Sequence, residues 1–219
     1  MDYLFNLVQN QAFIGVVASI SVVFIGFVFN EHLRSYKERR RGVAILERII
    51  RHNHTRLSKN TELLEKWVEC LDKKRTYQCN FSQLNTLNIE DTLHSRNIEL
   101  INLLIKQNDF FIDYNEDLIG NFYASYEQVK VMVADGKIDE KGWIEFQNNL
   151  HSQIKIFPDK SKVQEDELLK LLAMIRVEWS IQRLSLVGFL YWLMLLNIGP
   201  RVTKEKIDTE FKRIKASLK

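Results

Sequence analysis

One uncharged run of residues limits what this chain can fold into. Ala12–Phe29 (AFIGVVASISVVFIGFVF) holds eighteen residues whose only polar side chains are two serines. As a helix it would be roughly 27 Å long, close to the thickness of the hydrocarbon core of a bilayer. A signal peptide would need a basic segment before the run and a cleavage site after it. Only Asp2 is charged before the run, and Phe27-Val28-Phe29 ends it. Uninterrupted length and these flanks favour a membrane anchor over a buried core helix.

The residues after the run predict its orientation. No Lys or Arg precedes the run, and five follow it within a dozen residues: Arg34, Lys37, Arg39, Arg40 and Arg41. Because positively charged flanks stay in the cytoplasm, we expect a single-pass protein of the cell inner membrane with its N-terminus outside and its C-terminal domain inside. The same five side chains are candidate contacts for anionic lipid headgroups, or alternatively a stop-transfer flank with no further role.

Small residues recur along one stripe of the predicted span. Ala12, Gly15, Ser19 and Gly26 follow one another at spacings of three, four and seven, and Gly15 with Ser19 forms a small-xxx-small pair. Such residues let two membrane helices approach closely. These four positions are therefore candidate packing residues for self-association through the membrane segment.

A second hydrophobic stretch, Leu184–Ile198, is shorter. Its fifteen residues would make roughly 22 Å of helix, short for a membrane span. If the stretch crossed the membrane, the basic tail after it would lie outside, which the charge rule disfavours. We therefore interpret it as a buried core helix, with a second membrane segment as the alternative.

Residues 1–41 are predicted to form the anchor with its basic flank, and residues 42–219 an all-helical cytoplasmic domain. The first part of that domain carries a heptad seam, Val43, Leu46, Ile50, Asn53, Leu57, Asn60, Leu64, Trp67 and Leu71. In a coiled coil, buried Asn specifies register and oligomeric state, so Asn53 and Asn60 are candidate register residues. The alternative is the core face of a bundle helix whose middle is more polar.

The remaining pattern predicts helices joined by short turns. No stretch alternates as a half-buried strand would, so the fold class is all-α. Asp72–Asn80 is predicted as a loop and Asp135-Gly136 as a turn. The expected helices are a segment from about Ile89 to Gln107, an aromatic-rich one over Phe110–Val133, one capped by Asp139 and ended by Pro158, one over about Lys162–Asn197 behind a Ser161/Gln164 capping box, and an amphipathic tail over Ile207–Leu218.

Composition excludes several classes of function. The eight glycines never lie within five residues of one another, so neither a phosphate-binding loop nor a dinucleotide fingerprint is present. Cys70 and Cys79 have no zinc-ligand spacing, and we expect free thiols, no metal and no cofactor. A net charge of +3 does not indicate binding to duplex nucleic acid.

One short motif resembles an enzyme family. Arg48 and His54 form an Arg-x5-His pattern on a predicted helix, which is similar to the RxxxxxH motif of HEPN-type ribonucleases. The resemblance implies a compact all-α domain that places Arg and His at a dimer cleft, where the guanidinium steadies a phosphate and His moves a proton. Ile49 follows Arg48, where that family usually has a polar residue.

The features together predict a non-enzymatic, membrane-anchored protein that self-associates. Its cytoplasmic bundle would sense a small anionic ligand or a protein partner and act on or at the membrane. This arrangement is similar to that of membrane-anchored effectors of bacterial antiphage or stress responses, although no family is identified from residues. Two alternatives stay open: a membrane-tethered HEPN-like ribonuclease that uses Arg48 and His54, and a passive membrane scaffold.

Overall fold

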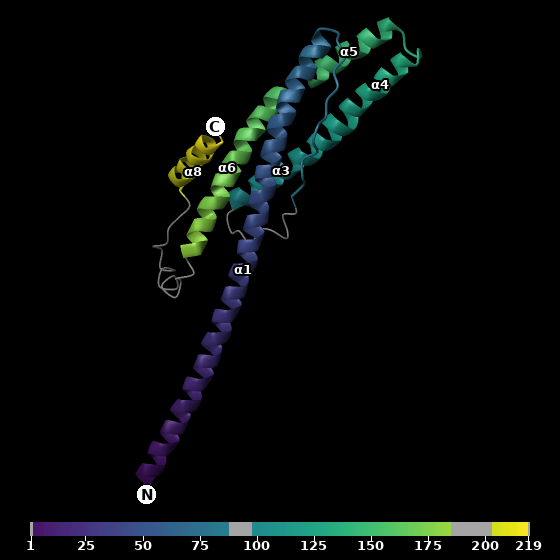
Figure 1. Ribbon diagram of the computed structural model, residues 1–219. Coiled ribbons are helices and arrows are strands. Elements are labelled where there is room, and N and C mark those ends of the chain that lie inside the picture. Colours follow the sequence, from purple (N-terminus) through teal and green to yellow (C-terminus); the bar gives the residue numbers. More distant parts are fainter. Residues whose placement is uncertain (1, 88–97, 185–202, 219) are drawn as a thin grey trace. The chain divides into compact units, whose positions relative to one another are not determined.

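A computed structural model describes residues 2–87, 98–184 and 203–218 of the chain. These residues form helices without a strand, which confirms the predicted all-α class. Figure 1 shows the helices: α1 (Asp2–Asp72), α3 (Ile98–Asp113), η1 (Tyr114–Tyr123), α4 (Ala124–Ala134), α5 (Glu140–Ile154), α6 (Phe157–Leu184) and α8 (Lys204–Ser217). The predicted core helix over Leu184–Ile198 lies, beyond Leu184 itself, outside the described residues.

The chain divides into two compact units, residues 1–42 and residues 43–219. The first unit consists of the N-terminal part of α1, and its side chains from Val16 to Phe29 are exposed. Ser19 and Ser21 each donate their hydroxyl to the carbonyl four residues earlier, at 2.8 Å. This helix is long and apolar enough to cross a membrane. The hydrogen bonds of the two serines within the helix would satisfy their hydroxyls inside a membrane, because lipid offers no hydrogen-bond partners.

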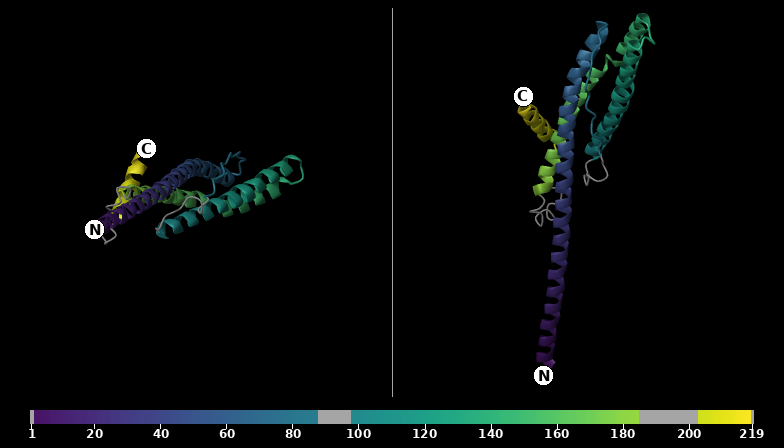
Figure 2. Two further views of the ribbon diagram at one scale, coloured as in Figure 1. Left: turned by 90° about the horizontal axis from the view of Figure 1, so that it is seen from below. Right: turned by 45° about the vertical axis from the view of Figure 1, so that its right-hand side comes forward.

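The second unit is built around α6. Leu168 through Val177 are buried on nearly every side of that helix, with only Lys170 exposed and Arg176 half-buried. Residues 43–72 of α1 lie beside α6 in both Figure 1 and Figure 2. Polar contacts join these helices along their length: Thr61 donates to Glu165 at 2.6 Å, and Lys162 pairs with Glu65 at 2.5 Å. Glu47 pairs with Arg176 at 2.7 Å.

The heptad seam of α1 is the face that enters this core. From Leu46 to Leu71, all eight of its positions are buried, and Val43 packs against the cluster. The apolar spacing thus identified the core-facing residues correctly. Within the described residues, the seam packs against other segments of its own chain.

Aromatic side chains fill the end of the core near the C-terminus of α1. Trp67 is fully buried, and its ring lies 5.4–5.8 Å from the rings of Phe81, Tyr123 and Tyr126. The edge-on geometry with both tyrosines is a favourable one for aromatic pairs. This cluster joins α1 to the segment after it and to the helices η1 and α4.

The predicted aromatic-rich helix over Phe110–Val133 is helical but not regular. Its central ten residues, Tyr114–Tyr123, form a π-helix, η1, between α3 and α4. Gly120 lies in this stretch, where a Cβ would come within 3.3 Å of the Asn115 backbone oxygen. Wide turns of this kind are rare and are found at functional positions more often than elsewhere.

The predicted boundaries of the next two helices are partly correct. Asp139 caps α5, since its carboxylate accepts from the Gly142 backbone N–H at 2.8 Å. The Ser161/Gln164 capping box is wrong. Helix α6 begins at Phe157, four residues before Ser161, so Ser161 lies inside the helix and is buried. Pro158 lies in the first turn of α6 and does not end α5. Proline is tolerated there because the N–H groups of the first helical turn have no partner within the helix, so the missing N–H costs no hydrogen bond.

Two helices end in the same hydrogen-bonded turn with different residues at its strained position. At the end of α1, Arg75 N bonds to Cys70 O at 2.8 Å and Lys74 N to Leu71 O at 3.1 Å. After α4, Lys137 N bonds to Met132 O and Gly136 N to Val133 O. Both are Schellman turns, whose penultimate residue adopts a left-handed conformation. That residue is Gly136 (φ 70°) in one turn and Lys74 (φ 56°) in the other.

We expect Lys74→Gly to stabilise the protein relative to Lys74→Ala. Both substitutions remove the contact of the Lys74 ammonium with Asn148. Only glycine also removes the strain of the left-handed conformation, which is about 1 kcal/mol. The difference in Tm between the two variants should be about 2–4 °C for a chain of this size. Thermal unfolding of the full chain in detergent, followed by circular dichroism, measures it. Equal melting of both variants would show that Lys74 is not strained.

Candidate functional site

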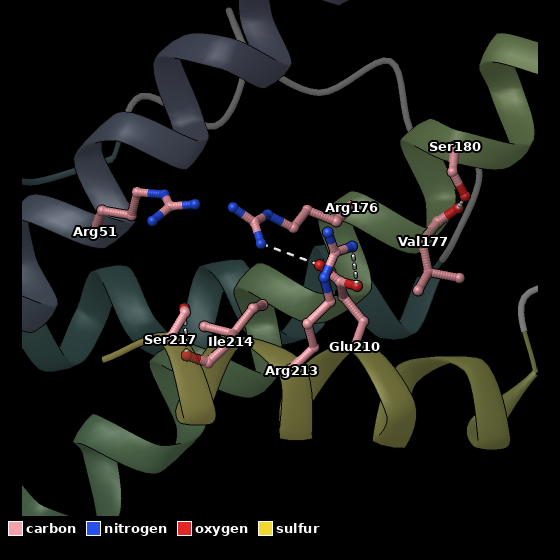
Figure 3. A pocket seen from close by; sticks show the side chains of 8 residues that line it. All are labelled: Arg51, Arg176, Val177, Ser180, Glu210, Arg213, Ile214 and Ser217. Carbon is pink, nitrogen blue, oxygen red and sulfur yellow. Dashed lines mark hydrogen bonds and ion pairs between the residues drawn. The ribbon is translucent and has the colours of Figure 1, made fainter. Parts of the chain in front are cut away.

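A cavity of about 480 Å³ lies where residues of α1, α6 and α8 meet in the second unit. Figure 3 shows its lining, in which Arg51 of α1 and Arg176 of α6 point toward each other. Among the described residues, the lining consists of Arg51, Arg176, Val177, Ser180, Glu210, Arg213, Ile214 and Ser217. Buried Ile207 and Ile214 attach the amphipathic helix α8 to the core, and this places Glu210 and Arg213 at the cavity.

Five charged side chains form a continuous chain of ion pairs along this cavity. Glu47 binds Arg51 at 2.9 Å and Arg176 at 2.7 Å. Glu210 binds Arg176 at 3.0 Å and Arg213 at 3.4 Å. Three guanidinium groups face two carboxylates, so the network carries an excess positive charge.

The central and terminal arginines of this network differ in exposure. The Arg176 side chain is 28% exposed, whereas that of Arg213 is 81% exposed and that of Arg51 46%. A guanidinium has five N–H donors in a planar fork, which suits carboxylate and phosphate oxygens. The exposed ends of the network therefore offer donors to an anion in the cavity, while Arg176 holds the helices together.

A second cavity, of about 430 Å³, lies along the exposed side of α1 and shares Arg51 with the first. Its lining consists of Ala44, Glu47, Arg48, Arg51, His52 and Thr55. Arg48 is exposed there, but His54 does not line this cavity. Burial lowers the pKa of His54, and Glu165 and Asp166 of α6 partly offset that shift. Within one chain, the two residues of the HEPN-like motif thus lie in different surroundings.

The chain that follows α1 is held by hydrogen bonds from side chains of the helices around it. Residues 75–87 have no regular secondary structure, as predicted for the start of this stretch, but they are tightly held. Cys79, Leu84 and Leu87 are buried, and Tyr77 and Phe81 are half-buried against the core. We refer to residues 77–87 as the strap.

Two asparagines of α1 bind the strap backbone in the same bidentate way. The Asn60 side chain accepts from Ser82 N at 3.0 Å and donates to Ser82 O at 2.7 Å. The Asn53 side chain accepts from Asn85 N at 2.8 Å and donates to Asn85 O at 2.7 Å. Each amide thus replaces the pair of hydrogen bonds that a neighbouring β-strand would make.

Two asparagines on the opposite side continue this pattern. Asn115 of η1 makes both bonds to the backbone of Leu84, each at 2.8 Å. Asn108 of α3 accepts from Leu87 N at 2.6 Å. These asparagines bind residues of the strap that are not bound by α1, so the strap is clamped from two sides.

The spacing of the four asparagines follows from helix and strand geometry. Asn53 and Asn60 are seven residues apart, as are Asn108 and Asn115, and each pair binds strap residues that are three apart. Seven residues of α-helix rise about 10.5 Å. Three residues of extended chain rise about 10 Å. Heptad-spaced asparagines on a helix therefore match an extended backbone that runs antiparallel to it.

Two tyrosines extend the clamp toward the start of the strap. The Tyr126 hydroxyl accepts from Tyr77 N at 2.9 Å, and the Tyr123 hydroxyl both accepts from Cys79 N and donates to Cys79 O. Burial raises the pKa of Tyr123 to about 12, so its hydroxyl keeps the proton that it donates. Burial also raises the pKa of the Cys79 thiol to about 12, which leaves little of the reactive thiolate at neutral pH.

The other residues singled out in the sequence lie in the first unit. Gly15, Ser19 and Gly26 are exposed on α1, and a Cβ added at either glycine would have no described atom within 4 Å. The side chain of Ala12 is outside the described set. Of the basic flank, Arg34, Lys37, Arg40 and Arg41 are exposed and Arg39 is half-buried. Packing between copies and contact with lipid stay predictions for these residues.

Sequence reasoning missed Arg51, Arg176 and Arg213 as a group, since they come from three helices far apart in the chain. It also missed Asn108 and Asn115, although their heptad spacing repeats that of Asn53 and Asn60. Among the residues that the structure describes, no group of three or more His, Cys, Asp or Glu side chains could hold a metal ion.

We expect Asn60→Ala to destabilise the second unit. The substitution removes two hydrogen bonds and leaves the Ser82 peptide poorly paired, a loss of about 2 kcal/mol. The Tm of the full chain in detergent should fall by about 4–8 °C. Asn102→Ala, at an exposed position of α3, is the control and should melt close to the unmodified protein. An unchanged Tm for Asn60→Ala would show that the strap contributes little to stability.

Comparisons with models of protein families, with curated proteins and with solved structures gave no match to this chain.

Proposed function

We propose that this protein is a membrane-anchored, self-associating sensor whose helical domain binds a small anionic ligand in the cavity between α1, α6 and α8. The observation that carries the proposal is the convergence of three guanidinium groups from three helices on one cavity of about 480 Å³. Arginine is the preferred side chain for planar, bidentate contacts to phosphate and carboxylate. A compact anion with phosphate or carboxylate groups fits that donor set.

The ion-pair network supplies a route from binding to a change in the domain. Glu210 is the contact of α8 with Arg176, and Arg213 of α8 shares that same carboxylate. An anion bound by Arg213 and Arg51 competes with Glu210 and Glu47 for these guanidinium groups. Binding would thus weaken the attachment of α8, while Lys215 paired with Asp166 at 2.7 Å and buried Ile214 would keep the helix tethered.

The role that we propose is binding rather than catalysis, with the membrane as its place of action. The apolar helix supplies the anchor, and the basic flank after it supports an N-out, C-in orientation in the inner membrane. Self-association would use the stripe of Gly15, Ser19 and Gly26. By its architecture, such a protein suits a bacterial antiphage or stress response, in which a cytoplasmic signal alters the membrane.

The orientation can be tested with tags at the two ends of the full chain. In intact bacterial spheroplasts, we expect added protease to remove an N-terminal tag and to spare a C-terminal tag until the membrane is permeabilised. Replacing Arg39, Arg40 and Arg41 by Gln should produce a mixed orientation, because it removes most of the positive flank. Replacing Lys204, Lys206 and Lys212 by Gln removes as much charge far from the span and should change nothing. An N-terminal tag that is protected in intact spheroplasts contradicts this orientation.

Anion binding can be tested with pyrophosphate as the probe, on the full chain in lipid nanodiscs at constant ionic strength. We expect calorimetric binding to the unmodified protein and at least a tenfold weaker affinity for Arg213→Met and for Arg51→Met. Lys206→Met, which removes an exposed cation of α8 outside the cavity, should bind as the unmodified protein does. Bound pyrophosphate should also speed amide hydrogen exchange in α8. An equally weakened affinity for pyrophosphate in all three variants would show that only the overall charge matters and would contradict a site in the cavity. No binding to the unmodified protein would overturn the proposal.

A further inference from the structure

The hydrogen bonds that hold the strap go mostly to its backbone, while its apolar side chains enter the core. At least one peptide N–H or C=O of Tyr77, Cys79, Ser82, Leu84, Asn85 and Leu87 is bound by a side chain from a helix. Backbone recognition requires an extended chain with apolar side chains at the right spacing, but it does not require that the chain be covalently continuous with the helices that bind it. A second copy of this protein carries the same segment and meets the same requirement.

The strap also marks the boundary between two halves of the second unit. Asn53, Asn60 and Arg56 hold it from α1, which precedes it in the chain. Asn108, Asn115, Tyr123 and Tyr126 hold it from helices that follow it. Only Lys73, Lys74, Arg75 and Thr76 connect the end of α1 to Tyr77, the first residue of the strap. Within this connection, Lys74 and Arg75 are bound by Asn148 and Gln147 of α5, which also follows it in the chain.

That connection is short and strained. Lys74 takes the left-handed conformation, with φ of 56°, at a position where glycine is the usual residue. Short hinge loops under strain favour the exchange of elements between identical chains, because an opened hinge relieves the strain and every other contact is remade. Anchoring in a membrane would add to this effect, since it raises the concentration at which two copies meet.

We propose that two copies exchange α1 at the Lys73–Arg75 hinge, so that residues 43–72 of each copy pack on residues 76 onward of the other. In the exchanged dimer, Asn53 and Asn60 of one copy bind Asn85 and Ser82 of the second copy. The two asparagines then specify the register between chains. The anion cavity of each half contains Arg51 from one copy and Arg176 with Arg213 from the other. This inference rests on the self-association part of the proposed function and does not depend on anion binding.

The exchange can be tested by disulfide formation between two differently tagged full-length copies in the same membrane. In a background with Cys70→Ser and Cys79→Ala, one copy carries Glu65→Cys and the other Lys162→Cys. These exposed residues pair between α1 and α6, so a bond between copies requires exchange of α1. We expect a disulfide-linked heterodimer after mild oxidation.

The matched control uses Asp166→Cys in one copy and Lys215→Cys in the other. This ion pair joins α6 to α8, and both residues follow the hinge, so the exchange leaves them within one chain. No heterodimer is expected from the control. Heterodimer from both pairs would indicate random collision, and heterodimer from neither would show that α1 stays with its own chain. Either outcome overturns the exchange.

Hinge variants give a second measurement that leaves both cysteine pairs in place. Lys74→Gly relaxes the left-handed turn and should lower the yield of the Glu65/Lys162 heterodimer severalfold. Lys74→Pro cannot adopt a positive φ and should raise it. Equal yields in all three proteins would contradict the role of the hinge and overturn the exchange at this position. Pyrophosphate binding, measured on the same samples, separates failure of this inference from failure of the sensor proposal, because the cavity also forms within a single chain.

Discussion

The second unit depends on how a buried, extended stretch of backbone satisfies its hydrogen bonds. A strand normally finds its partners in a neighbouring strand, but the strap lies among helices, whose own peptide groups are already paired. Side-chain amides solve this problem, because an Asn carboxamide carries a donor and an acceptor with the spacing of a peptide group. Asn53, Asn60 and Asn115 each use both groups on one strap residue. The apolar side chains of the strap can then enter the core without leaving orphaned peptide groups behind them.

The arginine network solves a different problem, the attachment of α8. That helix is short and carries many exposed charges, and its apolar attachment consists of buried Ile207 and Ile214 with partly buried Phe211. Ion pairs at exposed positions contribute little each, but Arg176 is largely shielded and bridges carboxylates from two other helices. An attachment that relies on such a network responds to competing anions in a way that apolar packing does not. The same feature therefore holds α8 in place and makes its position sensitive to a ligand.

Sequence reasoning predicted elements whose signals are local. The seam from Leu46 to Leu71, the Asp139 cap and the turn at Gly136 each depend on residues within a few positions of one another. It failed where the structure departs from the usual residue. Lys74 occupies the left-handed position of the turn after α1, where glycine is the usual residue. Pro158 lies in the first turn of α6, but α5 ends only a few residues earlier, so the proline was predicted to end α5. The arginine network is a meeting of three helices, and no single-chain periodicity specifies which faces of distant helices come together.

The heptad asparagines show where a local signal was sound but had two physical meanings. Buried Asn at heptad spacing suits a second helix in a coiled coil, because seven residues are nearly two turns. It suits an antiparallel extended chain equally well, because the rise of those seven residues equals that of three residues of strand. The hydrophobic pattern of α1 cannot distinguish a second helix from an extended chain, since either partner is apolar and packs on the same face of α1. The two meanings are separated by a second pair of asparagines with the same spacing, Asn108 of α3 and Asn115 of the adjoining η1. That second pair indicates that one extended backbone lies between the two pairs and is bound from both sides.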